Sequence, residues 1–544
     1  MLASNELTSL NTLKTPAAAA PPKISKISYP GNLISPLPDT DFRDFLDEVD
    51  HLLCFAPQII EKIEQDLDSH ALKKKRLREQ DREFFQNQTD KLPALDLPDP
   101  DASAATSPST LLEGRPRMSA TAVFLYLMLR GFLGSLTSKS ARRMILESIS
   151  LDDYLNRHGL KRSGETTILE NVNAVSFETR NFIMDRQIEL VLHEELDDFK
   201  EATIDSTSVK ANSSWPTDGK ILIGLLGRAQ RIGQQLHSLG LKDFRKGWLP
   251  RWLEKIHALE FRICLIAGKP KSRRKMKKYY RQLLKLGKQS AEALARELAN
   301  LEETLDIEKL PPSRREMCLR VLAQIRSDIA DAKRVIAYAN DRVFHGIILP
   351  STEKIMSLAD GSAAYIKKGG REAVIGYKPQ LVRSAKGFVT SLIVPEGNAA
   401  DSSELEPAIR ESIRRTGVVA GLVSTDDGYS SAKGRAALLD MGVKDVSISG
   451  AKGRKITTPA DWESEKYREA RRQRSAVESL MFTIKDGFEF GKLGRRGIDA
   501  VRQELSEKVL AYNTCRIILI RQRRKEEQRK RKGEQRREPA KRAA

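Results

Sequence analysis

The chain has 544 residues and a formal net charge of +20, from 93 Lys and Arg against 73 Asp and Glu. This length suits three or four domains of roughly 100–200 residues each. The positive charge favours a polyanionic partner, with nucleic acid ahead of an anionic membrane surface.

Several classes of protein are excluded by what the sequence lacks. The four cysteines are far apart, so they form neither a zinc ribbon nor a CxxC redox pair, and a reducing cytosol is the simplest setting. The most apolar stretch, 123–136, is interrupted by Arg130 and is too short to span a membrane. We see no secretory signal peptide and no P-loop motif.

The N-terminal part is expected to be helical after a disordered start. Residues 1–40 are rich in Ala, Pro and Ser and are expected to be disordered. Residues 41–87 show helical spacing of apolar residues, and 88–118 has the Pro and Asp content of a linker. Residues 119–200 are predicted to form several short helices, which fit both a DNA-binding helix-turn-helix and a plain helical bundle.

The rest of the chain predicts an α/β core with a helical insertion. Strands are expected at 202–205 and 209–211, a hairpin from 372–377 and 387–394, and further strands at 418–425 and 443–449. Helices are expected at 403–415, 433–441 and 461–512. Residues 201–224 and 345–515 would then form a mixed sheet flanked by helices, interrupted by a helical insertion at 225–344 and followed by a frayed basic tail at 516–544.

Three acidic residues stand where a metal site would need them. Asp205 and Asp426 each end a predicted strand, and Glu478 lies on a predicted helix with Arg474 and Lys485 on the same face. Carboxylates that converge in this way suit Mg²⁺ or Mn²⁺, and two such ions activate a nucleophile and stabilise a leaving oxygen in phosphodiester cleavage. The alternative is that the aspartates are turn or cap residues and that Glu478 is on a solvated helix face.

The segments IDSTSVKAN, TDDGYSSAKGRAAL and RSAVESLMFTIK, around Asp205, Asp426 and Glu478, resemble those of DDE transposases of bacterial insertion sequences. The resemblance covers roughly 110–515 and includes IKKGGREAVIGYKPQLVRSAKGFVTSLIV, which is similar to the segment between the first two aspartates of these enzymes. Asp427 is an alternative to Asp426, but the D-x-G-Y pattern places the ligand two residues before Gly428. Arg471 stands where the family's Y-x2-R-x3-E-x6-K signature has Tyr.

The resemblance implies an RNase H-like catalytic core in which Asp205, Asp426 and Glu478 bind the metal ions, while Arg474 and Lys485 contact DNA. It implies cleavage and strand transfer of DNA at terminal inverted repeats, with target DNA as second substrate and a homo-oligomer on the DNA. A bacterial cytoplasmic protein associated with the nucleoid is expected. The rival readings are a catalytically inactive DNA-binding protein, such as a decayed copy or repressor, and a nuclease on the same core.

A basic run at 269–288 is the second predicted DNA contact, because it contains ten cations and no acidic residue. Its densest part consists of Arg273, Arg274, Lys275, Lys277 and Lys278. These side chains are expected to contact phosphates, with a solvated helix face as the alternative. Tyr279, Tyr280, Trp248 or Trp252 could stack on an unpaired base, or else serve in a core.

Overall fold

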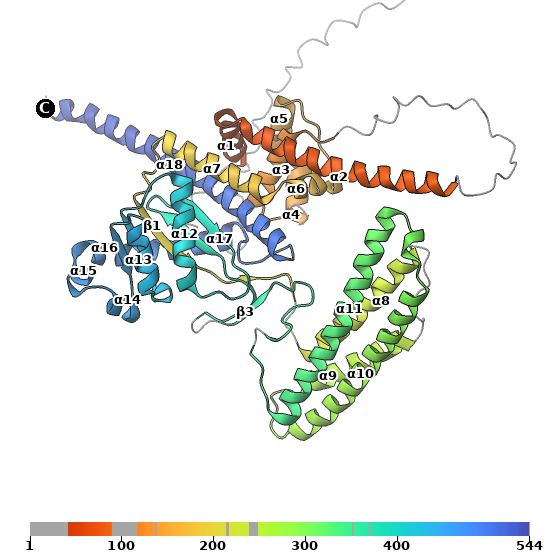
Figure 1. Ribbon diagram of the computed structural model, residues 1–544. Helices are drawn as coiled ribbons and strands as arrows, with labels where there is room; N and C mark the ends of the chain where they lie inside the picture. Colours follow the sequence, from red (N-terminus) through yellow and green to blue (C-terminus); the bar gives the residue numbers. More distant parts are fainter. Residues whose placement is uncertain are drawn as a thin grey trace, which may run out of the picture.

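The protein is described by a computed structural model that covers residues 42–89, 117–135, 139–213, 217–238, 248–350, 353–368 and 372–542 (Figure 1). The expected disordered start and most of the expected linker lie outside these residues. No helix in the described ranges is long and apolar enough to cross a membrane.

A five-stranded mixed sheet forms the centre of the described α/β core. Its strands are β1 (Glu201–Ser206), β5 (Gln380–Ser384), β6 (Val389–Ile393), β7 (Leu422–Thr425) and β8 (Asp445–Ile448). Their order is β6-β5-β1-β7-β8. β5 pairs antiparallel with both β6 and β1, whereas β7 pairs parallel with both β1 and β8. Three antiparallel strands followed by two parallel ones give the RNase H-like core that the sequence predicts.

Helices cover both faces of this sheet (Figure 1), and apolar side chains of the strands pack against them on each face. On one face, Ile204 and Val423 pack with Leu405 of α12 (Asp401–Thr416) and Leu438 of α13 (Ala432–Asp440). On the other, Leu381 packs in one cluster with residues of α17 (Ser475–Gly487) and α18 (Ile498–Arg542). The alternation of side chains along each strand assigns every residue to one of these two layers.

The predicted hairpin from 372–377 and 387–394 is wrong. β6 pairs instead with β5, a strand that we did not predict. β4 (Val374–Tyr377) belongs to a separate small sheet with β2 (Val209–Lys210) and β3 (Ala364–Ile366), in the order β2-β4-β3. The sequence did not predict β5 because Gln380 and Arg383 interrupt its apolar residues. In the structure Gln380 is nevertheless fully buried and is bonded to Asp401.

The predicted continuous helix at 461–512 is also wrong. The chain forms α15 (Pro459–Glu463), α16 (Glu465–Gln473) and α17, and then turns through 488–497 before α18 begins. Gly497 has a φ of 84° and Glu489 a φ of 50°, which an α-helix cannot contain. The following helix α18 continues to Arg542, so the described part of the expected frayed tail is helical.

The N-terminal helices pack onto the α/β core in one shared hydrophobic cluster. They are α1 (Phe42–Phe55), α2 (Gln58–Thr89), α3 (Ala120–Phe132), α4 (Lys139–Glu147), α5 (Ile149–Arg157), α6 (Glu165–Ala174) and α7 (Phe177–His193). Helix α3 is buried on nearly all sides and lies against α18. A helix that is apolar all round belongs to a core, so the packing favours the plain bundle over the helix-turn-helix for this part.

The insertion is a lobe of long helices with a hydrophobic cluster of its own. It contains α8 (Asp218–Ser238), α9 (Trp248–Ile266), α10 (Arg273–Thr304) and α11 (Pro312–Asn340), and it ends in a π-helical turn, η3 (Asp341–His345). Every regular element described between Asp218 and His345 is helical. The far end of α2 meets this lobe, where Asp81 accepts hydrogen bonds from the backbone N–H and the hydroxyl of Ser313 (Figure 1).

Candidate active site

Two aspartates lie side by side at the carboxyl ends of the neighbouring parallel strands β1 and β7. The register pairs Thr203 with Ser424, and the hydroxyls of these two residues are 2.8 Å apart on one face of the sheet. Asp205 and Asp426 each follow two residues later, so their side chains point to that same face. The strand pairing thus brings together two residues that are far apart in the sequence.

Asp426 shows the electrostatic consequence of this placement. Its Oδ1 accepts a hydrogen bond of 2.9 Å from the backbone N–H of Gly428. Burial raises the pKa of Asp426, and the neighbouring carboxylate of Asp205 raises it further, although Lys368 opposes the effect. Two crowded carboxylates that repel each other are stabilised by a cation.

Lys368 already supplies one positive charge to this pair. It follows β3 of the small sheet, and its Nζ lies 2.9 Å from Asp205 Oδ1, 2.5 Å from the carbonyl oxygen of Ser206 and 2.9 Å from the Ser206 hydroxyl. Sequence reasoning missed this role. Lys368 was part of the quoted IKKGG stretch, but nothing in its spacing links it to Asp205.

Tyr429, the last residue of the D-x-G-Y pattern, is buried close to the carboxylates of the site. It is fully buried, and its hydroxyl donates to Gln380 Oε1. Burial and the nearby carboxylates of Asp401, Asp205 and Asp426 hold the pKa of Tyr429 well above its usual range. A Cβ at Gly428 would lie 3.0 Å from Asp426 Oδ1, so the glycine permits the tight turn below the site.

Asp427, the alternative to Asp426, has a structural role. Its Oδ1 accepts hydrogen bonds of 2.9 Å from the backbone N–H groups of Lys452 and Gly453, at the start of α14 (Ala451–Ile456). These bonds lower the pKa of Asp427, although its slight burial acts in the opposite direction. The carboxylate is therefore engaged at a helix N-terminus, away from Asp205.

Glu478 lines the same cavity as the aspartate pair but is turned toward Arg474. The cavity has a volume of about 610 Å³, and its wall includes Asp205, Lys368, Asp426, Arg474, Glu478 and Lys485. Glu478 Oε1 lies 3.3 Å from an Arg474 guanidinium nitrogen, and its side chain is 64% exposed. The structure thus gathers all five predicted residues of the carboxylate site around one space.

The three acids do not form a closed ligand set. In the described ranges, no group of three or more Asp, Glu, His or Cys side chains could hold a metal ion together. Asp205 and Asp426 fit a divalent cation, because two carboxylates crowd together on one face of the sheet. Glu478 stands at the cavity wall with its carboxylate paired to Arg474.

Comparison with known families gives a match for the segment that carries Asp426 and Glu478. Residues 347–514 match the family model of the transposase DDE domain. The matched segment is similar to a transposase DDE domain. No curated protein and no solved structure matches the chain. Asp426 and Glu478 lie inside the matched segment, and β1 brings Asp205 to it from before the insertion by pairing with β5 and β7.

The DDE domain departs from the usual signature at Arg471, and the structure shows what this arginine does. Its guanidinium carbon lies 4.4 Å from the ring centre of Trp462, and two of its nitrogens donate to the Trp462 carbonyl oxygen at 3.1 Å. Arg471 therefore joins α16 to α15. It is not among the residues that line the carboxylate cavity.

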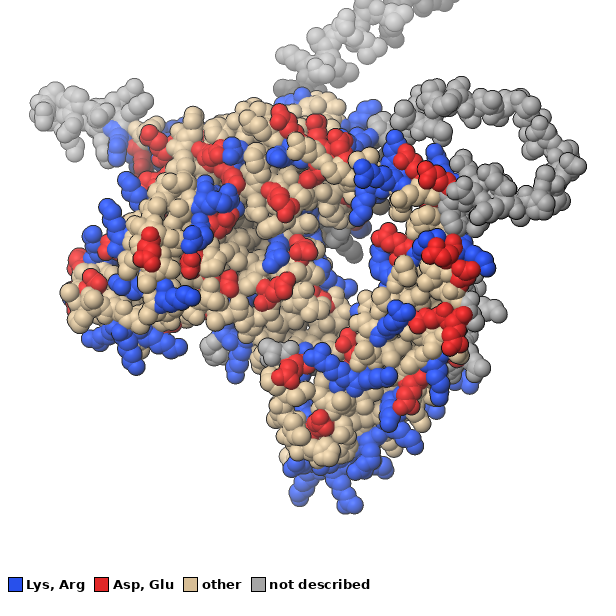
Figure 2. All heavy atoms as spheres, viewed as in Figure 1, with Lys and Arg blue, Asp and Glu red and all other residues tan. Residues whose placement is uncertain are grey.

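The basic run lies at one end of the helical insertion, apart from the cavity of the DDE domain. Figure 2 shows Lys and Arg side chains gathered at the lower end of this lobe. Arg273, Arg274, Lys275 and Lys278 are exposed, whereas Lys277 is half-buried with its Nζ 5.8 Å from the ring centre of Phe344.

The aromatic residues of this lobe do not all suit base stacking. Tyr280 is only 6% exposed and bonds Asp218 and Arg342, which favours the core role over base stacking for this residue. Its apolar neighbours in the sequence predict this burial, because Leu283 and Leu284 are one helical turn away and also buried. Tyr279 and Trp252 are half-buried, and the Trp248 side chain is outside the described part.

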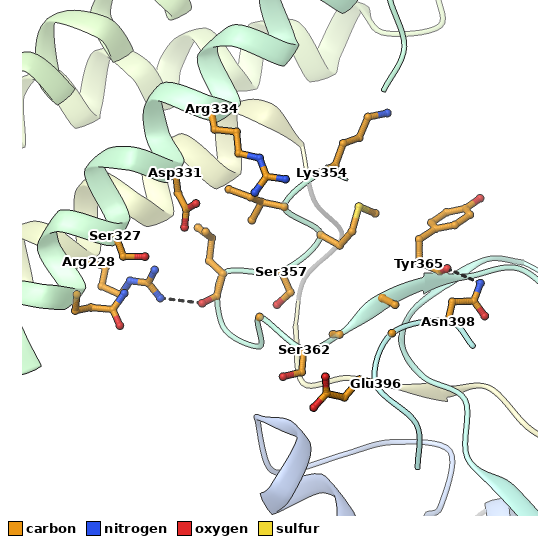
Figure 3. A pocket seen from close by; sticks show the side chains of 18 residues that line it. Arg228, Ser327, Asp331, Arg334, Lys354, Ser357, Ser362, Tyr365, Glu396 and Asn398 are labelled. Atoms are coloured by element: carbon orange, nitrogen blue, oxygen red, sulfur yellow. Dashed lines mark hydrogen bonds between the residues drawn. The ribbon is translucent and has the colours of Figure 1, made fainter. Parts of the chain in front are cut away.

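A larger cavity, of about 810 Å³, lies where the insertion meets the small sheet (Figure 3). Two of its arginines are bonded to the protein itself. Arg228 pairs with the buried Asp328 and donates to the Leu358 carbonyl oxygen at 2.9 Å, and Arg334 donates to the Glu353 carbonyl oxygen. The cavity thus lies at the junction between the insertion and the small sheet.

Proposed function

We propose that this protein is a transposase that cleaves DNA strands at the ends of a bacterial insertion sequence and joins the freed 3′ ends to target DNA. The observation that carries the proposal is the placement of Asp205 and Asp426 on one face of an RNase H-like sheet, in a cavity shared with Glu478. The transposase DDE domain over 347–514 supplies the family context. Asp205 and Asp426 would hold one Mg²⁺ or Mn²⁺ ion, and Glu478 would complete a site for two.

A bound divalent cation supplies Lewis-acid activation of a phosphodiester and lowers the pKa of an attacking hydroxyl or water. The protein's own groups then have separate tasks. Arg474 holds Glu478 at the cavity wall. Lys485 brings a cation to the same cavity, where a phosphate would enter. Burial and the nearby carboxylates raise the pKa of Tyr429 and so favour its neutral, protonated form.

DNA contact outside the cavity is assigned to the exposed cations of the insertion. Arg273, Arg274, Lys275 and Lys278 occupy the first turns of α10 and project from the lobe. Lys277 packs on Phe344 and is assigned a supporting role instead. Because phosphate contacts release counterions, binding through this surface would weaken steeply with salt. Two DNA ends and a target require several such surfaces, so we propose a homo-oligomer on the DNA.

The test is strand cleavage of a plasmid that carries the gene with its flanking DNA, in Mg²⁺ or Mn²⁺. We expect D205N and D426N to abolish cleavage and to leave DNA binding close to wild type, because the basic surface is unchanged. D427N is the matched control, since Asp427 only caps α14. Cleavage that persists in D426N would overturn the proposal, and binding without cleavage by the wild-type protein would favour the inactive DNA-binding alternative.

A further inference from the structure

Lys368 has the surroundings of a bound cation. Its ammonium has three N–H groups, and three oxygens lie within 2.9 Å of Nζ, from the carboxylate of Asp205 and from the carbonyl and hydroxyl of Ser206. The neighbouring Lys367 is exposed, so the contact is particular to Lys368 and not to the basic stretch as a whole.

The ammonium and a divalent cation would need the same oxygen. Asp205 Oδ1 is the atom that Lys368 contacts, and Asp205 is one of the two carboxylates that fit a metal ion. A divalent cation on this carboxylate would lie a few ångströms from the ammonium, and the two positive charges would repel each other. Metal binding and the Lys368–Asp205 contact therefore oppose each other.

The position of Lys368 allows its side chain to move away from Asp205. It lies beyond the end of β3 in the small sheet, whereas Asp205 lies on β1 of the central sheet, so the lysine can move without breaking a strand pair of the central sheet. Its side chain is 30% exposed and lines the same cavity as Arg474 and Lys485. The four-carbon stem of lysine is flexible and its ammonium binds phosphate as a point charge.

We propose that Lys368 is the resident counter-ion of the Asp205–Asp426 pair, that a divalent cation displaces its ammonium from Asp205, and that the displaced ammonium binds a phosphate of DNA in the same cavity. This inference rests on the proposed metal site. It assigns to Lys368 two successive partners, first a carboxylate and then a phosphate.

The first experiment measures Mn²⁺ binding to the full-length protein without DNA, by titration calorimetry. We expect K368M to bind Mn²⁺ about tenfold more tightly than wild type, because a competing unit charge has been removed. K368Q, which keeps a polar group near Ser206 without the charge, should show the same tightening. K367M is the matched control for net charge and should bind as wild type. Equal or weaker Mn²⁺ binding by both Lys368 variants would overturn the proposal.

The second experiment measures the salt dependence of duplex binding with and without the divalent cation. With Ca²⁺ or Mn²⁺ present, K368M should lose one phosphate contact, which lowers the log–log slope by about 0.9. In EDTA the ammonium stays on Asp205, so wild type and K368M should have equal slopes. The same slope change in both conditions would contradict the exchange of partners.

The failure of this inference can be told apart from failure of the proposed function. If wild type binds Mn²⁺ no better than D426N, the metal site itself is refuted, and the role of Lys368 falls with it. If D426N loses Mn²⁺ binding while K368M and K368Q match wild type, the metal site stands and the role of Lys368 is refuted.

Discussion

Replacing Glu507 by Gln tests how the N-terminal helices are joined to the DDE domain. Glu507 lies on α18, and its side chain is 1% exposed. It is bonded by Arg130 of α3, by Arg180 of α7 and by Arg495 of the turn after α17, at 2.5–3.1 Å. Burial would raise the pKa of Glu507, but these three guanidinium groups hold it well below its usual range.

The expected cost follows from this burial. Arg130 and Arg180 are also buried, so E507Q would leave two guanidinium groups with no carboxylate to neutralise them. Removing one partner from a buried ion pair costs about 3–5 kcal/mol. Because the folded-state pKa is depressed, the contribution of Glu507 is present above the unfolded pKa and is lost only as the pH falls through the folded value.

The assay is urea unfolding of the full-length protein, followed by circular dichroism at neutral pH. We expect E507Q to lower the free energy of unfolding by about 3–5 kcal/mol. E526Q is the matched control, because Glu526 lies on the same helix and is exposed. A loss in E507Q no greater than that in E526Q would refute the reasoning that this buried cluster holds the two parts together.

Three further predictions concern Glu48, the basic run of the insertion and Asp81. Burial raises the pKa of Glu48 from 4.5 to about 7, although Arg521 opposes the shift. The free energy of unfolding should therefore fall as the pH rises from 4.5 to about 7. E48Q should make this pH dependence weaker, as measured by thermal unfolding at several pH values. R274E/K278E should lower the log–log salt slope of DNA binding by about 0.9 for each lost phosphate contact, and an unchanged slope would place DNA elsewhere. D81A should cost about 1 kcal/mol and speed hydrogen exchange at the start of α11, because Asp81 caps Ser313.

The sequence predicted a strand correctly where a run of apolar residues determines the local structure. The apolar run before Asp426 predicted a buried strand, and the strand ends of β1 and β7 lie together as expected. Glycines at 487, 491, 494 and 497 also marked the break between α17 and α18, but the amphipathic spacing on either side suggested one continuous helix.

Features that depend on contacts between distant segments could not be predicted. β5 contains Gln380, which is buried only because Tyr429 and Asp401 bond its amide group. Lys368 reaches Asp205 only because the small sheet lies against the end of β1. The spacing of residues in the sequence predicts neither the contacts of Gln380 nor that of Lys368.

The most direct test of the proposed metal site is to locate the metal ion. Crystals of the full-length protein grown with Mn²⁺ would give an anomalous difference map in which each ion appears as a peak. We expect a peak between the carboxylates of Asp205 and Asp426. Mn²⁺ bound at other carboxylates, with none between these two aspartates, would contradict it.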